Sequence, residues 1–456
     1  MTGSTLTTNR VWNSRAFASL PRFGWLAVGQ IFVMGISTLG FAVLARTMGP
    51  VPFSTFATLI FIFTVCSLAT DLSPQGFLLV YGDGPRQRRA AQRSAVVSSL
   101  SGGALVLLLT STVAPAVTGQ DVTLIESTLL SSAVLFQVLG QLPRADLLLG
   151  RRYGPAALID GAASLISVSF AVVVSLNAPQ VWVLCAQLTV YSLLRLLLMS
   201  AFRFRSASEA HDDTGAGWVD AVRYGLRVLP LNVSAYLSRA LDSGLLPGVI
   251  PNVAAASYAR SYQVIVAPIS QVQLSVGGAV LERLSNSHRD GRLDEASGRV
   301  WHVLLIFGAA SAATIGGASF LIARVLFGHG WPMAEVFVSA MSCAIPGLFV
   351  AMYCSWQLQL IASARQSLRQ LAIALLSPIG VLCASYLLGT RGALGSLVIL
   401  ALVTPSVMLH SQQALLPGAV SGLRAQLQLT LAWLPSAAIF LLVSTGVGFW
   451  TVSEWR

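Results

Sequence analysis

A group of charged and hydroxyl side chains lies on one face of an otherwise apolar helix, and these residues could bind a polar ligand. The segment 223–251 reads RYGLRVLPLNVSAYLSRALDSGLLPGVIP. With about 100° of rotation per residue, one face spanning roughly 100° holds Arg223, Arg227, Ser234, Ser238 and Asp242. An ionised side chain at bilayer depth costs about 2.5–3.5 kcal/mol on insertion scales, so it is expected to face a cavity or a partner. The segment therefore predicts that neighbouring helices enclose a polar space.

Three arginines and one aspartate are the candidate ligand-binding residues of that space. Arg239 lies three residues before Asp242 and within pairing reach of it, and Arg260 enters the next helix within the sequence YARSY. Together with Arg227, these guanidinium groups could hold an anion through paired N–H donors, with Asp242 orienting Arg239. Two other interpretations remain open. Arg239 and Asp242 could be a structural pair between helices, and Arg260 could extend to the outer membrane interface.

Asp71 is a candidate for coupling transport to a proton or a cation. It lies in the apolar run 53–80, about nine residues before the inner end, which corresponds to a depth of roughly 14 Å in a continuous helix. A carboxylate at that depth could instead be the counter-ion of a neighbouring arginine. The sequence leaves both interpretations open.

The composition is that of a membrane protein that crosses the bilayer many times. The 456 residues are 55% hydrophobic and only 10% charged, with a mean hydropathy of +0.74, whereas soluble proteins carry about 25% charged residues. The net charge of +11 does not indicate nucleic-acid binding, because the arginines separate apolar runs. The five cysteines fall inside those runs and the five histidines are scattered. The sequence therefore predicts no metal, no cofactor and no catalytic residue.

Thirteen apolar runs account for most of the chain. They lie at about 23–45, 53–80, 94–117, 124–149, 155–176, 181–202, 221–247, 253–281, 301–325, 333–361, 371–388, 394–416 and 428–450. If the N-terminus is cytoplasmic, 20 arginines fall in the inner connections and four in the outer ones. This asymmetry predicts that orientation, with the C-terminus outside after an odd number of spans.

A weak internal repeat predicts two six-helix lobes. The first run ends in LARTMGPVPFSTFA and the seventh in LLPGVIPNVAAASYA, at corresponding places of the two halves. Because each half has an even number of spans, the two would be parallel repeats around a central cavity. The predicted parts are a cytoplasmic N-terminal segment, the first lobe, a cytoplasmic linker, the second lobe, and a C-terminal linker with one additional helix, at 1–22, 23–202, 203–220, 221–416 and 417–456.

Several motifs, in this order, resemble the Wzx-type flippases of bacterial polysaccharide biosynthesis. They are ARTMGPVPFSTFA, DLSPQGF, LDSGLLPGVIPNVAAASYARSYQV, SNSHRDGRLDEASGRVW and LFGHGWPMAE. These flippases belong to the multidrug/oligosaccharidyl-lipid/polysaccharide superfamily, which shares its fold with the MATE exporters, and the resemblance covers about residues 20–416. It implies alternating access and a cargo of undecaprenyl-pyrophosphate-linked oligosaccharide, destined for O-antigen, capsule or exopolysaccharide.

The resulting expectation is a flippase of the bacterial cytoplasmic membrane and not an enzyme. Its expected partners are the polyprenyl-pyrophosphate-linked oligosaccharide, membrane lipids and other polysaccharide-assembly membrane proteins. The alternatives are a cation-coupled MATE-type exporter and, less favoured, a membrane glycan polymerase or ligase. Such an exporter is expected to have an acidic rather than an arginine-rich cavity and such a polymerase a long external loop. The deep charges of this sequence include both signs, and its outer connections are short.

Overall fold

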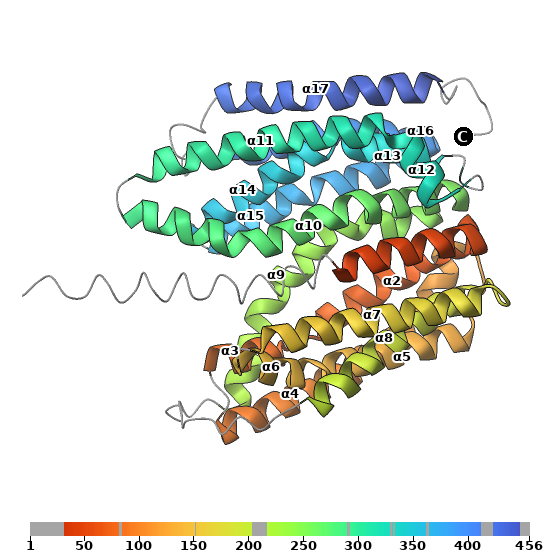
Figure 1. The fold of residues 1–456 in the computed structure, drawn as a ribbon, viewed down its shortest axis with the longest axis vertical. Helices are drawn as coiled ribbons and strands as arrows, with labels where there is room; N and C mark the ends of the chain where they lie inside the picture. The colour runs from red at the N-terminus through yellow and green to blue at the C-terminus, as the bar shows by residue number, and fades with distance from the viewer. Residues whose placement is uncertain are drawn as a thin grey trace, which may run out of the picture.

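The structure is a computed structural model and it is helical wherever it shows regular secondary structure. It describes residues 32–81, 84–150, 152–202, 217–289, 292–328, 331, 333–361, 364–411 and 423–446, and these contain no strand. The expected all-α membrane fold is confirmed (Figure 1).

Two groups of helices make up the molecule. The first contains the helix Phe32–Met48 and α2 (Pro50–Thr70), α3 (Pro74–Tyr81), α4 (Pro85–Thr118), α5 (Leu124–Leu139), α6 (Gln141–Leu149), α7 (Tyr153–Ser175) and α8 (Val181–Ala201). The second contains α10 (Asn252–Arg289), α11 (Leu293–Gly317), α12 (Ser319–Leu326), α13 (Ala334–Ser342), α14 (Ile345–Ile361), α15 (Ala364–Ala374), α16 (Leu376–Ser411) and α17 (Leu423–Gly446).

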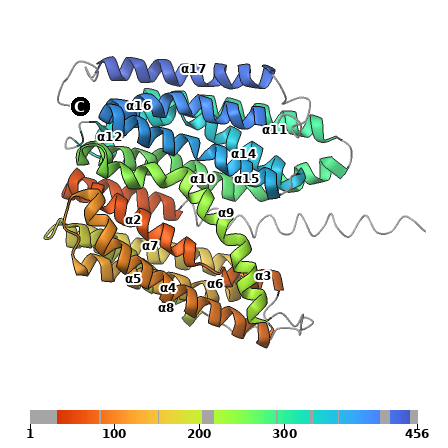
Figure 2. The ribbon, with the colours of Figure 1, turned by 180° about the vertical axis from the view of Figure 1, so that it is seen from behind.

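Helix α9 (Trp218–Leu245) crosses between the two groups and is followed by the short 3-10 helix η1 (Leu246–Gly248). Seen from behind, α9 runs diagonally from the neighbourhood of α3 toward α10 (Figure 2). It packs against α2 and α4 of the first group and also against α16 of the second. Thr58 of α2 donates a hydrogen bond to the carbonyl of Gly244 at 2.9 Å. A helix held by both groups is well placed to couple their movements.

Eight of the described helices are long and apolar enough to cross a membrane, or nine if the bent pair α13 and α14 counts as one span. Each of the thirteen predicted runs contains a described helix. The arginine distribution predicts that the end of the molecule carrying α12, on the right in Figure 1, faces away from the cytoplasm. We call it the outer end, and the end carrying α3 and α6 the inner end.

The predicted run 53–80 is not one continuous helix, which corrects the sequence-based expectation. Helix α2 ends at Thr70 and α3 begins at Pro74, with Ser73 at φ 50° between them. Pro74 has no N–H to continue the helical bonding and disfavours helical geometry in the residue before it. Gly225 of α9 packs against this break, where a Cβ would lie 2.6 Å from the Cα of Leu72.

Two predicted runs, 371–388 and 394–416, lie within α16. The backbone leaves helical geometry at Gly389 (φ 61°, ψ −144°), in the left-handed region that favours glycine. A Cβ on Gly380 would lie 2.5 Å from Leu400, so the two parts of α16 run side by side. The chain therefore reverses at Gly389, as the two separate runs predicted.

Helix α17 is the predicted additional C-terminal helix, and it covers α11 on the far side of the second group (Figure 1). The indole N–H of Trp301 in α11 donates to Gln428 Oε1 at 2.8 Å. Trp301 itself is fully buried and packs at 5.3 Å between ring centroids on Tyr353 of α14. These contacts dock α17 away from the surface where the two groups meet.

Candidate functional site

A cavity of about 350 Å³ lies where α2 of the first group meets α9 and α10. This volume is at the lower end of the range for small-molecule sites, which runs from roughly 300 to 1,000 Å³. Five of its thirteen lining residues are aromatic. The rings that line it belong to Phe53, Phe56, Phe61, Tyr236 and Tyr262. Such a surface can pack against the apolar face of a sugar ring or of another flat organic group.

Four polar side chains interrupt this apolar wall. They belong to Thr64, Ser243, Arg260 and Gln263. Among the described lining residues Arg260 alone is charged, so the described lining carries a positive rather than a negative charge. Hydroxyl and amide groups can donate and accept hydrogen bonds, which suits an oligosaccharide better than a purely apolar ligand.

Arg260 lies inside the molecule, between two phenylalanine rings. It is 3% exposed. Its Cζ lies 3.7 Å from the ring centroid of Phe53 and 4.4 Å from that of Phe41, and its Nη1 donates to Gln263 Oε1. Both rings come from the first group of helices, whereas Arg260 is on α10. This burial argues against the interpretation that Arg260 extends to the membrane interface.

A second cavity of about 180 Å³ also borders Arg260 and Gln263. It is lined by the helix Phe32–Met48, by α10 and by the region from Leu326 to Phe327. Arg260 therefore separates two spaces. No carboxylate within the described part of the chain pairs with it, and the aromatic faces supply the electrostatic partner instead.

Asp242 is buried and linked to α10. Its Oδ2 accepts a hydrogen bond from the hydroxyl of Tyr258, and its Oδ1 accepts one from the backbone N–H of Ser243 at 2.7 Å. It does not line the larger cavity, whereas its neighbour Ser243 does. Asp242 thus links α9 to α10 beside the cavity.

Arg227 and Arg239 are on α9, but their side chains lie outside the residues that the structure describes. Their contact with a ligand, and the pairing of Arg239 with Asp242, stay predictions. The backbone position is informative because α9 crosses between the two groups, and Tyr236 and Ser243 of the same helix line the larger cavity.

Asp71 lies at the helix break and not within a continuous span. Its Oδ1 accepts from the backbone N–H of Ser73 at 2.7 Å, and its Oδ2 accepts from Gln141 Nε2 at 3.4 Å. The backbone N–H of Leu72 donates to Ser98 Oγ at 3.0 Å. Asp71 does not line the larger cavity, and its role in ion coupling stays a prediction.

Other arginines of the first group are paired with carboxylates. Asp160 accepts from Arg195 Nε at 2.7 Å and lies 3.5 Å from Arg144 Nη2, while Arg88 pairs with Asp146 at 2.6 Å. These pairs partly neutralise their cations.

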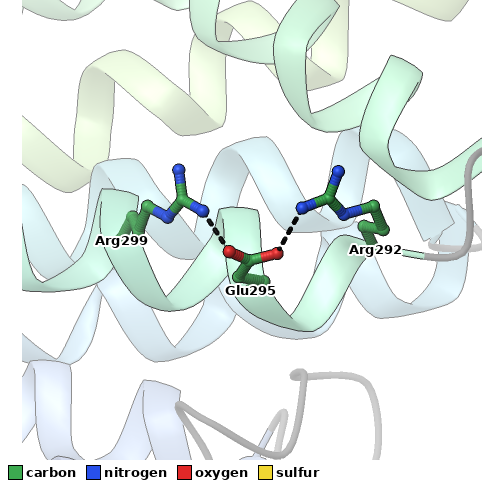
Figure 3. A network of polar contacts seen from close by, with 3 residues as sticks. All are labelled: Arg292, Glu295 and Arg299. Atoms are coloured by element: carbon green, nitrogen blue, oxygen red, sulfur yellow. Dashed lines mark hydrogen bonds and ion pairs between the residues drawn. The ribbon is translucent and has the colours of Figure 1, made fainter.

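At the start of α11 a further ionic group lies on the surface. Glu295 accepts from Arg292 at 3.0 Å and also from Arg299, as Figure 3 shows. The three side chains are more than half exposed, so solvent screens their attraction. Within the described ranges, no group of three potential metal ligands is present.

Sequence reasoning selected Arg260 and Asp242 but missed their partners. Phe41 and Phe53 are on the first two helices, and nothing in their local sequence points to Arg260. Tyr258 was visible only as a neighbour of Arg260, whereas its hydroxyl bonds to Asp242. The nearest sequence signal was the alternation in YARSY, which places Tyr258 and Arg260 two positions apart.

Comparison with known proteins gives a family. Residues 43–336 match the family described as "Polysaccharide biosynthesis protein". No curated protein matches the chain.

Several solved structures share the fold. The chain is similar to a lipid II flippase MurJ in an inward closed conformation, with a TM-score of 0.64 and 10% identity over 92% of this chain and 98% of that one. It is also similar to an inward-facing multidrug resistance MATE family transporter of the MOP superfamily (TM-score 0.62, 16% identity, 85% and 98% coverage). For an outward-facing one the TM-score is 0.55, with 15% identity and 86% and 95% coverage. At these identities the likeness establishes the fold.

Proposed function

This chain belongs to the polysaccharide biosynthesis protein family, and from this membership we propose that it is a Wzx-type flippase. Its cargo would be an undecaprenyl-pyrophosphate-linked oligosaccharide, carried across the bacterial cytoplasmic membrane by alternating access. The membrane-spanning fold supports transport rather than catalysis. The N-terminus would face the cytoplasm, as the arginine distribution predicts.

The observation that carries this proposal is Arg260 in an aromatic cavity. A diphosphate bears at least two negative charges, and a guanidinium group can bind it through paired N–H donors. The aromatic rings and the hydroxyl and amide groups of the same cavity suit the sugars. Arg227 and Arg239 would add positive potential from α9, while the prenyl chain would stay in lipid.

The MATE-type exporter is less well supported. Its fold is shared, but a cavity whose described charge is a buried arginine would repel an organic cation. A polymerase or ligase is less well supported still, because the outer connections are short.

Export in a deletion strain tests the proposed function. Without the gene, a lipid-linked glycan should accumulate on the cytoplasmic face of the membrane, and the wild-type gene should restore export. Arg239→Ala and Arg260→Ala should reduce export at normal protein abundance, and Arg239→Lys should recover part of it because Lys keeps the charge but loses the planar fork. Arg324→Ala is the matched control, since exposed Arg324 contacts Phe320 at 5.5 Å and lines neither of the two cavities. Wild-type export by Arg239→Ala and Arg260→Ala would contradict the proposed cargo site.

A further inference from the structure

A cluster of contacts closes the outer end of the molecule between the two groups of helices. The indole N–H of Trp331 donates to the carbonyl of Ala45 at 3.1 Å, and the guanidinium group of Arg46 donates to the carbonyl of Val325. Trp331 packs on Phe327 with 5.6 Å between ring centroids. We call these five residues the outer seal. Ala45 and Arg46 come from the first group and the other three from the second.

Phe53 connects this seal with the arginine of the cavity. Its ring packs against that of Trp331, with 5.7 Å between ring centroids and an interplanar angle of 56°. The guanidinium group of Arg260 lies 3.7 Å from the centroid of the same Phe53 ring. Phe53 is 1% exposed, so both contacts lie inside the protein. A continuous line of packed groups therefore leads from Arg260 through Phe53 to Trp331.

We propose that Arg260, Phe41 and Phe53 form a latch that holds the outer seal closed until an anion enters the cavity. A cation between two rings is attracted to both faces, and here the rings and the cation belong to different groups of helices. The latch therefore favours the arrangement in which those groups meet at the outer end. It is worth most where water is excluded, which is where Arg260 lies.

An anionic cargo would weaken this latch by competing for the same cation. A phosphate group draws the guanidinium group into hydrogen bonds in its own plane, and these are stronger than a contact with a ring face. Because Arg260 borders both cavities, a modest rotation of its side chain exchanges one set of contacts for the other. The cargo would then select the state in which the outer seal opens, since it binds that state more tightly.

This inference rests on the proposed function and also names what it recognises: a diphosphate rather than a neutral glycan. Gln263 positions the guanidinium group of Arg260 for this recognition. Its Oε1 accepts a hydrogen bond from Arg260 and holds the group at the edge of the cavity. A neutral sugar bound to the aromatic wall would leave the latch intact. Opening would therefore require the charged part of the cargo.

The latch can be tested by measuring the distance across the outer end in the full-length protein. Spin labels are introduced at exposed Leu124 of the first group and exposed Tyr386 of the second, with the exposed Cys383 replaced by Ser. Double electron–electron resonance then reports the distance between the two labels in lipid nanodiscs, with and without inorganic diphosphate. Calorimetry on the same samples reports whether diphosphate binds. Diphosphate should lengthen the distance, whereas an equal ionic strength of chloride should not.

Three variants define the expected result. Phe53→Leu removes one ring of the latch and should raise the ratio of open to closed molecules at least about tenfold without diphosphate. Arg260→Gln should do the same and should also abolish the response to diphosphate. Trp331→Phe keeps a ring but loses its N–H, so it should open the seal partly and keep the response. Arg324→Gln is the control, because Arg324 is a cation that also lies near a ring. This variant should give the same distance distribution as the wild type.

The outcomes separate the latch from the proposed function. If diphosphate binds but the distance does not change, the latch is wrong and the cargo site stands. If no diphosphate binds, both fail. If Arg260→Gln does not fold, Phe53→Leu still decides, because a wild-type distance distribution in that variant would overturn the latch.

Discussion

The arginines that surround Asp160, on the one hand, and Arg260, on the other, show two different ways of stabilising a cation inside this protein. Asp160 binds Arg195 at 2.7 Å and lies 3.5 Å from Arg144, so each of these arginines has a carboxylate beside it. Arg260 lies between Phe41 and Phe53 and pairs with no carboxylate among the described residues. An ion pair cancels most of the field of its cation, whereas aromatic rings stabilise a cation and leave its net charge. The first arrangement holds helices together, whereas the second leaves a positive charge beside the two cavities, where we propose that the cargo binds.

Asp160→Ala should have the largest effect on stability. It would leave Arg144 and Arg195 mostly buried without a carboxylate, at a cost of about 3 kcal/mol, because breaking a buried ion pair exposes the desolvation penalty of the remaining charge. The measurement is the thermal unfolding midpoint of the protein in detergent, with its abundance in the membrane. Arg144→Gln, which keeps the shorter pair, should cost less. A wild-type midpoint for Asp160→Ala would show that the cluster is not structural.

Arg260→Gln should have the opposite profile. Export should fall at least about tenfold, equivalent to about 1.4 kcal/mol, because the cavity loses its described cation. The unfolding midpoint should change less than for Asp160→Ala, since no buried carboxylate is left unpaired. Measuring both quantities on the same samples would reveal a merely structural role for Arg260: stability and export would then fall together.

Tyr258→Phe tests a carboxylate, Asp242, whose described side-chain partner is neutral. It removes the hydroxyl that donates to Asp242 and leaves the backbone N–H of Ser243 as the remaining donor that the structure describes. We expect a loss of about 1–2 kcal/mol in stability, as for other buried acceptors that lose a donor. Thermal unfolding again provides the measurement, and Asp242→Asn in the Tyr258→Phe background should recover part of the loss. An unchanged midpoint would mean that water replaces the hydroxyl.

Glu295→Gln should have the smallest effect. Its pairs with Arg292 and Arg299 are exposed, and solvent screens such pairs so that they contribute little to stability. Stability and export should both match the wild type within error, and added salt should make no difference to the comparison. A clear loss of export with normal abundance would instead indicate a functional surface at the start of α11.

The sequence predicted the helices better than it predicted their interruptions. Hydropathy alone located a helix in each of the thirteen runs. A span requires about 20 apolar residues, and because lipid offers no hydrogen-bond partners, their backbone N–H and C=O groups must bond to one another within a helix. It missed the break at Asp71, although Pro74 was an available signal. The reversal at Gly389 was correctly expected, since the sequence GTRGA interrupts the apolar pattern there.

Composition and periodicity by themselves determined that this chain spans a membrane, that it is helical, and that Arg260 and Asp242 are unusual. These properties depend on the free energy of moving individual side chains and backbone groups into lipid, which can be read residue by residue. Only the tertiary structure decided what surrounds them. Phe41 and Phe53 reach Arg260 from the first two helices, and among the described residues the hydroxyl of Tyr258 was found beside Asp242. Such contacts depend on how distant helices pack, and no local pattern encodes that packing.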